Sequence, residues 1–241
     1  MKKGNKAVIM CAALLAAAAF FPAGGFCAGK MAAVAVFVSG DAQVKLAGAE
    51  GYTALKVNDS LSAGDSIKTG AGAKVSLVTK GGAEVRINEN STFDLPAKSA
   101  VREMYDLRVG QVWSRMLSKM AKLSVRTPAA VCAIRGTEAD IEQKDILTVK
   151  VYEGHVDLNN AAGKQALKAG QLSTVTGAGA PAAPREMNSG EMGKWQEEID
   201  VKDIGEYLKK LGMSKDGDKK LKLKVEKDGT AKDVDIKLKQ K

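Results

Sequence analysis

Short apolar runs that alternate with polar residues and are separated by glycine extend from Met31 to about Thr176. This period of two is typical of strands with one buried face, because successive side chains of a strand point to opposite sides. The glycines suit the connecting turns, since glycine reaches the positive φ that tight hairpins require. The pattern therefore predicts an all-β sandwich or barrel over residues 31–176, and it lacks the fixed period of a β-solenoid.

The composition is that of a chain with a packed core. Of its 241 residues, 45% are hydrophobic, which excludes disorder throughout the chain. The 25 glycines show no three-residue period, so the chain is not collagen-like. Three cysteines form too few disulfides to stabilise a chain of this length, which excludes a disulfide-rich scaffold. The net charge of +9 favours anionic surfaces but says nothing about the fold.

The N-terminal residues follow the basic, apolar and small-residue order of a secretory signal peptide. Lysines precede an apolar run, Ala7–Phe21, of about 15 residues, whereas a spanning helix needs roughly 20. We therefore expect residues 1–28 to be a cleaved signal peptide and the mature chain to be periplasmic or secreted. The alternative is an uncleaved run that anchors the chain in the inner membrane. The residue order leaves the cleavage site open.

Two cysteines bear on export and on the core. Cys27 would be the lipidated residue of a lipoprotein, but the bulky Phe26 before it disfavours that interpretation. Cys132 is flanked by apolar residues, which predicts a buried strand thiol that behaves as a small hydrophobe. The sequence leaves open whether Cys27 survives cleavage and pairs with Cys132.

Two segments follow the expected β domain. Residues 177–188 are rich in glycine, alanine and proline without apolar periodicity, which indicates a linker. Residues 189–212 carry apolar residues at helical spacing, with Ser189 as the expected cap of a first helix and Asp200 or Asp203 at the start of a second. We interpret the apolar side of this helical segment as a face packed on the β domain, with a partner-binding face as the alternative.

Residues 213–241 form a lysine-rich tail in which apolar and charged residues alternate on both sides of Asp228-Gly229. This pattern predicts a β-hairpin. We interpret its lysine face as a solvated surface that opposes edge-to-edge aggregation, and the alternative is contact with an anionic envelope polymer or lipid surface. Membrane contact is therefore expected only through this tail or an uncleaved N-terminus.

The sequence lacks the residue sets of the common catalytic and metal sites. His155 is the single histidine, no strained serine turn precedes a helix, and one histidine with one secure cysteine cannot make a zinc site. The acid pairs Glu138 with Asp140 and Glu84 with Glu89 are interpreted as solvated. The basic residues are scattered and stacking aromatics are absent, which argues against nucleic-acid binding. We therefore expect no enzyme activity, cofactor, metal or nucleic-acid partner.

Several glycine-centred units follow one another in a recognisable order. The segment 124–141 contains Thr-Pro at its start and Arg-Gly-Thr further on, and it resembles the signature of the FecR domain family. Leu61–Gly70 and Gly82–Ile87 upstream, and Val149–Val156 and Leu167–Gln171 downstream, resemble the flanking units of that family. The resemblance covers roughly residues 34–175 and implies a β-sandwich of jelly-roll type.

The resemblance also singles out a set of family-motif residues, which we expect to be structural: Gly64, Asp65, Thr127, Pro128, Arg135, Gly136, Thr137, Glu153, Gly154, Gly170 and Gln171. Pro128 fixes φ at the start of a strand, and Gly136 and Gly154 permit turn or bulge geometry. Arg135 is expected to form a structural ion pair, with Glu153 as a candidate partner, or to contact a ligand. None of the motif residues is expected to be catalytic.

Known FecR proteins include inner-membrane regulators whose periplasmic domain receives a signal from an outer-membrane receptor and whose cytoplasmic tail controls a sigma factor. Only six residues precede the apolar run here, too few for such a tail. The resemblance therefore implies a non-catalytic exported protein that acts as a binding or scaffolding module of the bacterial cell envelope. Its expected partner is an envelope protein or glycan. The alternative is a membrane-anchored signalling protein that relays envelope status to a partner.

Overall fold

The structure is a computed structural model that describes residues 31–96, 103–118, 121–193, 195–201 and 203–212. It gives the backbone alone for Thr137 and for residues 219–227 and 230–238. The expected signal peptide and Cys27 lie outside the described residues. Strands make up 56% of the chain and helices 6%, which confirms the all-β class. Within the described part, no helix is long and apolar enough to cross a membrane.

The strands of the β domain are, in chain order, β1 (Met31–Ser39), β2 (Ala42–Lys45), β3 (Thr53–Ala54), β4 (Ser60–Ser62), β5 (Ser66–Thr69), β6 (Lys74–Thr79), β7 (Ala83–Ile87), β8 (Thr92–Asp94), β9 (Met104–Met116), β10 (Lys122–Arg126), β11 (Val131–Gln143), β12 (Ile146–Asn160), β13 (Gly163–Lys168), β14 (Gln171–Thr176) and β15 (Arg185–Glu186).

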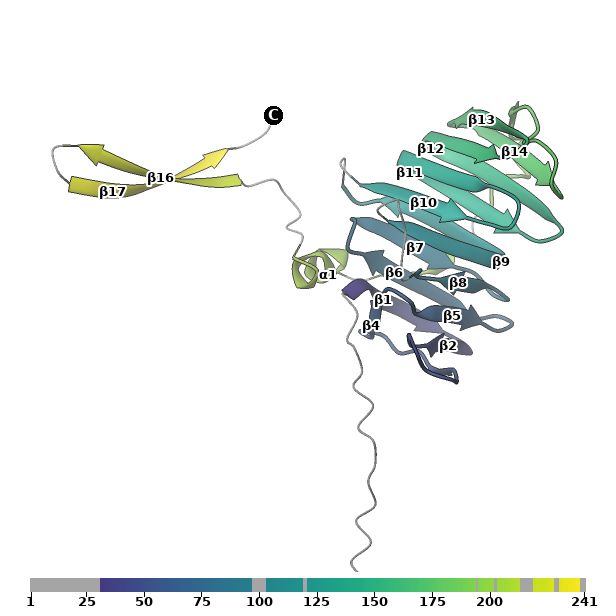
Figure 1. The fold of residues 1–241 in the computed structure, drawn as a ribbon, viewed down its shortest axis with the longest axis horizontal. Helices are drawn as coiled ribbons and strands as arrows, with labels where there is room; N and C mark the ends of the chain where they lie inside the picture. Colours follow the sequence, from purple (N-terminus) through teal and green to yellow (C-terminus); the bar gives the residue numbers. More distant parts are fainter. Residues whose placement is uncertain are drawn as a thin grey trace, which may run out of the picture.

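All 15 strands are hydrogen-bonded into one continuous sheet, and the pairings divide it into two layers. The first layer has the order β3-β2-β5-β8-β9-β10-β11-β12-β13. The second layer has the order β4-β1-β6-β7-β9-β11-β12-β14-β15. Figure 1 shows the stack of strands from β2 and β4 at one end to β13 and β14 at the other.

Three long strands, β9, β11 and β12, belong to both layers. The first half of β11 pairs with β10, and its second half pairs with β9. Each of the three strands changes layer at a glycine with positive φ, which is 104° at Gly110, 61° at Gly136 and 73° at Gly154. Because glycine adopts positive φ without a side-chain clash, these residues let one strand serve two layers. The two layers of the sandwich are therefore joined through these bent strands and are not two separate sheets.

The hydrophobic core lies between the two layers. Ile67 and Phe93 of the first layer and Leu77 and Val85 of the second belong to a single buried cluster. In each strand these residues occupy alternate positions, as the period of two predicts. Cys132 lies in the same core, and burial raises the pKa of its thiol to about 12. The expectation of a buried strand thiol at Cys132 is therefore confirmed.

The C-terminal part differs from the expectation of two full helices. Residues Trp195–Glu198 form one 3-10 turn, η1, and Ile204–Lys210 form α1. No helix begins at Ser189, because the Asn188 carboxamide accepts bonds from two nearby backbone N–H groups and closes a turn instead. The expected hairpin at the C-terminus is present as β16 (Lys219–Lys227) and β17 (Thr230–Leu238).

The segment expected to be a linker is bound to the sheet. The Ala182 N–H donates to the Thr174 carbonyl at 2.9 Å, and Ser173 Oγ donates to the Ala182 carbonyl at 2.6 Å. The following β15 pairs with β14. A glycine- and proline-rich composition therefore marks here a segment that follows a strand edge without forming a regular strand.

Candidate functional site

The first family-motif residues, Gly64 and Asp65, build the turn between β4 and β5. Asp65 is buried, and its carboxylate accepts hydrogen bonds from the backbone N–H groups of Ala47 and Ser62, both at 2.8 Å. Gly64 has a φ of 102°, and its N–H donates to the Leu95 carbonyl. Both oxygens of Asp65 are therefore engaged in holding backbone together.

Thr127 and Pro128 form the turn that connects β10 to β11. The buried Thr127 hydroxyl accepts from the N–H groups of Ala129 and Ala130, both at 3.2 Å, and donates to the Ala130 carbonyl at 3.1 Å. Such a threonine turn replaces backbone hydrogen bonds that a tight connection leaves unmade. This pair of motif residues also has a structural role.

Arg135 and Glu153 lie near the bends of β11 and β12 but do not pair with each other. The Arg135 guanidinium lies 3.2 Å from Asp157 Oδ2, so the ion-pair partner suggested for Arg135 is corrected from Glu153 to Asp157. Glu153 is exposed and lies opposite Glu138 in the strand register. Only the backbone of Thr137 is described, as part of β11. Arg135, Glu153 and His155 are all exposed.

Gly170 and Gln171 organise the start of β14. The Gly170 N–H donates to the Val151 carbonyl at 2.8 Å, and Gly170 has a φ of 85°. The Gln171 carboxamide accepts from the Lys168 N–H and donates to Glu186, both at 3.0 Å. The motif residues are thus distributed over separate turns and bends, and the structure does not bring them together into one site.

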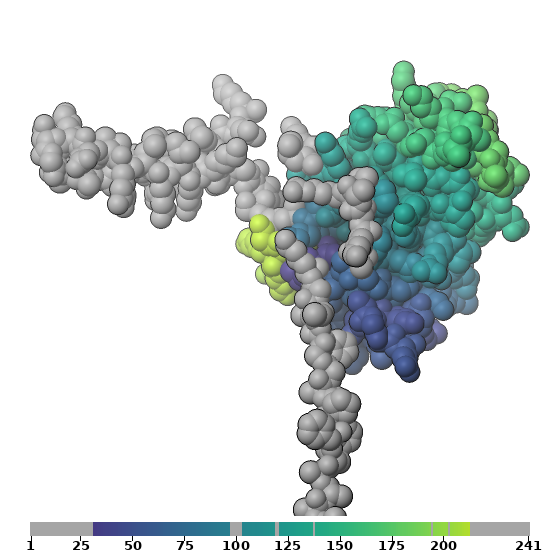
Figure 2. Space-filling view, in the orientation of Figure 1, coloured from purple at the N-terminus to yellow at the C-terminus, as the bar shows by residue number. Residues whose placement is uncertain are grey.

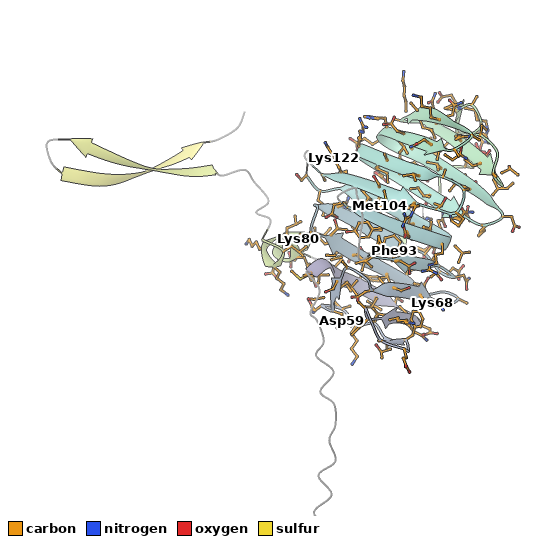
Figure 3. The ribbon with its side chains drawn as sticks, viewed as in Figure 1. Asp59, Lys68, Lys80, Phe93, Met104 and Lys122 are labelled. Carbon is orange, nitrogen blue, oxygen red and sulfur yellow. The ribbon has the colours of Figure 1, made fainter. Side chains whose placement is uncertain are left out.

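A groove of about 460 Å³ lies on the outer face of the first layer, over β2, β5, β8 and β9. The inward residues Ile67 and Phe93 lie in the core, so their strand neighbours Ser66, Lys68 and Asp94 face outward into this groove. Figure 3 locates Lys68 on β5 and Phe93 on the neighbouring β8. We call this feature the β5–β8 groove.

The side chains of the β5–β8 groove form a connected polar network. Ser66 Oγ donates to Asp94 Oδ1 at 2.5 Å and lies 3.2 Å from the Tyr52 hydroxyl. The Arg108 guanidinium forms an ion pair with Asp94, and the hydrogen bond to Asp94 raises the pKa of Arg108, which therefore keeps its charge. Lys68 Nζ lies 4.4 Å from the centre of the Tyr52 ring. The groove therefore presents fixed donors, acceptors and one aromatic ring to a ligand.

Sequence reasoning missed the β5–β8 groove. Its residues come from four strands, from the loop before β3, from the turn between β4 and β5 and from the residues after β8. Only the Gly64-Asp65 turn among them belongs to the family motif. The available signal was the alternation itself, which assigns Ser66, Lys68 and Asp94 to the outward face. Among the described residues, no group of three or more histidine, cysteine or acidic side chains is placed to hold a metal ion.

Two of the acidic residues that were expected to be solvated are buried on the outer face of the second layer. Glu84 is 0% exposed and Asp140 is 1% exposed, so that expectation is wrong for both. Glu84 Oε1 accepts from Arg86 at 2.7 Å, and Glu84 Oε2 accepts from Arg115 at 2.6 Å. The residues that cover this face come from the C-terminal segment, and Trp195 Nε1 donates to Asp140 Oδ2 at 2.8 Å.

The environment of Asp140 predicts a pH-dependent stability. Burial raises the pKa of Asp140 to about 6, while hydrogen bonds from Gln111 and Trp195 and the charge of Lys150 act to lower the pKa, and Glu142 raises it. Because the folded-state pKa lies above the ordinary value of 3.8, protonation stabilises the folded state. This stabilisation is complete below about pH 4 and is lost as the pH rises through about 6.

We therefore expect the stability of the wild type relative to Asp140→Asn to fall by about 1–3 kcal/mol between pH 4 and pH 7. Urea unfolding of both proteins at several pH values measures this difference, and the comparison cancels the titration of the other carboxylates. The nearby Tyr152 remains neutral in this range, because burial raises the pKa of its hydroxyl. A difference that does not change with pH would show that Asp140 is not held in a protonation-sensitive environment.

The bent two-layer sheet, with motif residues at its turns and a polar groove on its surface, defines a β-sandwich domain. Residues 65–157 match the family model described as FecR protein. Residues 65–157 are therefore identified as a FecR domain. The match begins at the Asp65 turn and ends in β12, and the structure adds β1 to β4 and β13 to β15 to the same sheet.

Two crystal structures, at 1.65 and 2.50 Å resolution, of a candidate anti-sigma factor from Parabacteroides distasonis ATCC 8503 are similar to this chain. Each is 15% identical with a TM-score of 0.45, and each match covers 52% of this chain. The chain spans 60% of the length of that protein. No curated protein matches the sequence.

Proposed function

We propose that this FecR-domain protein is a non-catalytic, exported binding module of the bacterial cell envelope and that the β5–β8 groove is its ligand site. The observation that carries the proposal is the convergence of Tyr52, Lys68 and Arg108 with their hydrogen-bonded acids in one open groove. The family-motif side chains hold turns and bends, and the Gly64-Asp65 turn also borders the groove. Export itself is supported by the signal-peptide pattern of residues 1–28.

The chemistry of the groove favours an envelope glycan as the ligand. Its cations, Lys45, Lys68 and Arg108, lie among the carboxylates of Asp94 and Asp106, so the lining offers donors and acceptors side by side. Ligand sites of this kind use a few fixed polar groups for orientation and an adjacent ring for contact area. A glycan with hydroxyl, amide and carboxylate groups matches this lining better than an apolar molecule.

The double substitution Tyr52→Ala and Lys68→Ala is expected to weaken glycan binding at least tenfold. The change removes the ring and the adjacent cation without touching the core, and a tenfold loss corresponds to about 1.4 kcal/mol. The measurement is cosedimentation of the purified mature chain with peptidoglycan and with soluble envelope polysaccharide. Lys80→Ala is the matched control, because Lys80 is an exposed lysine far from Lys68 in Figure 3.

Two results would count against the glycan site. Equal binding by the wild type and the double variant would exclude the β5–β8 groove, and binding to an envelope fraction that disappears after protease treatment of the fraction would identify a protein ligand. A lack of binding to every fraction, for the wild type as well, would contradict the binding function itself.

The second candidate function is a membrane-anchored signalling protein that relays envelope status to a partner. It is supported by the FecR domain, because the family includes inner-membrane regulators, and by the apolar run Ala7–Phe21. The mass of the mature protein separates the two candidates. A first residue between Phe26 and Lys30 supports the free module, and an intact N-terminus supports the anchored relay.

A further inference from the structure

The C-terminal segment crosses the outer face of the second layer. We call residues 187–193, 195–201 and 203–212 the strap. Its first residue, Met187, donates its N–H to the Gly170 carbonyl at the start of β14, and α1 at its other end packs on β1 and β6. Figure 2 shows the yellow-green α1 against the purple and blue N-terminal strands. The strap thus runs across the strands from one edge of this layer towards the other.

The centre of the strap is held by three side chains from three different strands. Asp140 on β11 accepts the indole N–H of Trp195 at 2.8 Å. Arg86 on β7 donates to the Gln196 carbonyl, and Lys74 on β6 forms an ion pair with Glu198. One acceptor, one side-chain donor to a backbone carbonyl and one cation therefore contact three of the four strap residues 195–198.

The recognising side chains are held in place by groups outside the strap. Glu84, which is fully buried, accepts from Ser76 and from Arg86. The Arg86 guanidinium also lies 4.8 Å from the centre of the Trp113 ring. A charged group oriented by a buried partner and an aromatic ring is a preorganised donor. The face under the strap is therefore a built surface whose geometry does not depend on the strap alone.

The strap fits this face imperfectly. The side chain of Gln196 is buried, yet its Oε1 has no hydrogen-bond partner among the described residues. The carboxylate of Asp140 is buried at the same contact. An unsatisfied buried polar group costs about 1–3 kcal/mol. Release of the strap removes this cost, which offsets part of the stabilising free energy that is lost with the other strap contacts. Segments held in this way open locally at lower cost than the core.

From these contacts we infer that the outer face of the second layer is a peptide-binding surface, occupied by the strap of the same chain and specific for a tryptophan followed three residues later by a glutamate. The strap is then a displaceable internal ligand. Release of the strap exposes Lys74, Arg86 and Asp140 to a second peptide of the same kind. This surface is separate from the β5–β8 groove, so the inference stands independently of the proposed glycan site.

The test uses the full mature chain and a labelled synthetic peptide of residues 187–212. In the variant Glu198→Lys, repulsion from Lys74 weakens the strap, and we expect at least tenfold tighter peptide binding than in the wild type. Glu198 has a side chain that is 67% exposed, so this substitution does not threaten the fold. Glu197→Lys is the matched control, because it makes the same charge change at an exposed neighbouring residue.

A second pair of measurements connects the tighter binding to this surface. Hydrogen exchange of the backbone amides of residues 195–199 is expected to accelerate in Glu198→Lys, while exchange in β7 and β11 stays unchanged. Adding Lys74→Ala to Glu198→Lys is expected to reduce peptide affinity again, because the peptide loses its partner for the glutamate. Faster strap exchange without gain of peptide binding, or equal binding by the Glu197→Lys and Glu198→Lys variants, would overturn the inference.

Discussion

Gly110→Ala is expected to destabilise the protein by about 3–5 kcal/mol. A Cβ at this position would lie 2.1 Å from Ser91 Oγ and 2.5 Å from Ser91 Cα, and the φ of 104° is itself unfavourable for alanine. Ser91 cannot simply move away, because its hydroxyl accepts the Gln111 N–H at 3.0 Å and its own N–H donates to Thr69. The substitution therefore strains the point at which β9 passes from one layer to the other. Urea unfolding of the mature chain measures the loss.

Gly136→Ala is the matched control for this prediction. Gly136 lies at the equivalent bend of β11 with a φ of 61°, but a Cβ there meets no atom within 4 Å. Only the positive φ disfavours alanine at this position, so we expect the free energy of unfolding to fall by about 1–2 kcal/mol. Equal losses for the two variants would mean that the close approach to Ser91 contributes nothing and that the bend alone sets the cost.

Glu84→Ala is expected to cost about 3–5 kcal/mol, because it leaves buried positive charge without its counter-charge. The carboxylate lies between Arg86 and Arg115, and the side chain of Arg86 is itself only 10% exposed. Arg86 also holds the Gln196 carbonyl, so strap contacts weaken together with the sheet. The expected result is a lower urea midpoint, together with faster hydrogen exchange in residues 195–199.

Two further variants make the Glu84 prediction specific. Glu153→Ala removes an exposed carboxylate from the neighbouring part of the sheet and is expected to change stability by less than about 0.5 kcal/mol. The double variant Glu84→Ala and Arg86→Ala is expected to be less destabilised than the sum of the single variants, because the two charges are removed together. Additive losses would show that Glu84 and Arg86 do not act as a pair.

Local pattern was sufficient for much of the fold. The runs Val75–Val78 and Ala83–Ile87, separated by Lys80-Gly81-Gly82, predict two strands of a hairpin, and they lie in β6 and β7, which pair with each other. The same reasoning predicted the C-terminal hairpin, whose strands flank Asp228-Gly229. A strand and a tight turn are decided by neighbours within a few residues, so a single sequence carries the information for both.

The helical segment and the linker were predicted less well, for a reason that is also physical. Helical spacing around Trp195 suggested a helix, but the indole of Trp195 is bound to Asp140, which is 55 residues away in the chain. The Gly-Ala-Pro segment suggested a free linker, but hydrogen bonds to β14 hold it against the sheet. Tertiary contacts override a weak local preference in both cases.

The candidate sites depended most on the three-dimensional arrangement. Alternation correctly assigns Lys68 and Asp94 to one face of their strands, but only the pairing of β5 with β8 brings them into one groove. Alternation also places Glu84 and Asp140 on the outer face of the second layer, where the natural inference is contact with water. Asp140 is buried where Trp195 of the strap binds it, and Glu84 is buried between Arg86 and Arg115, of which Arg86 also holds the strap. The residues of a chain thus specify strands and turns through short-range geometry, whereas burial of a polar face depends on where a distant segment comes to lie.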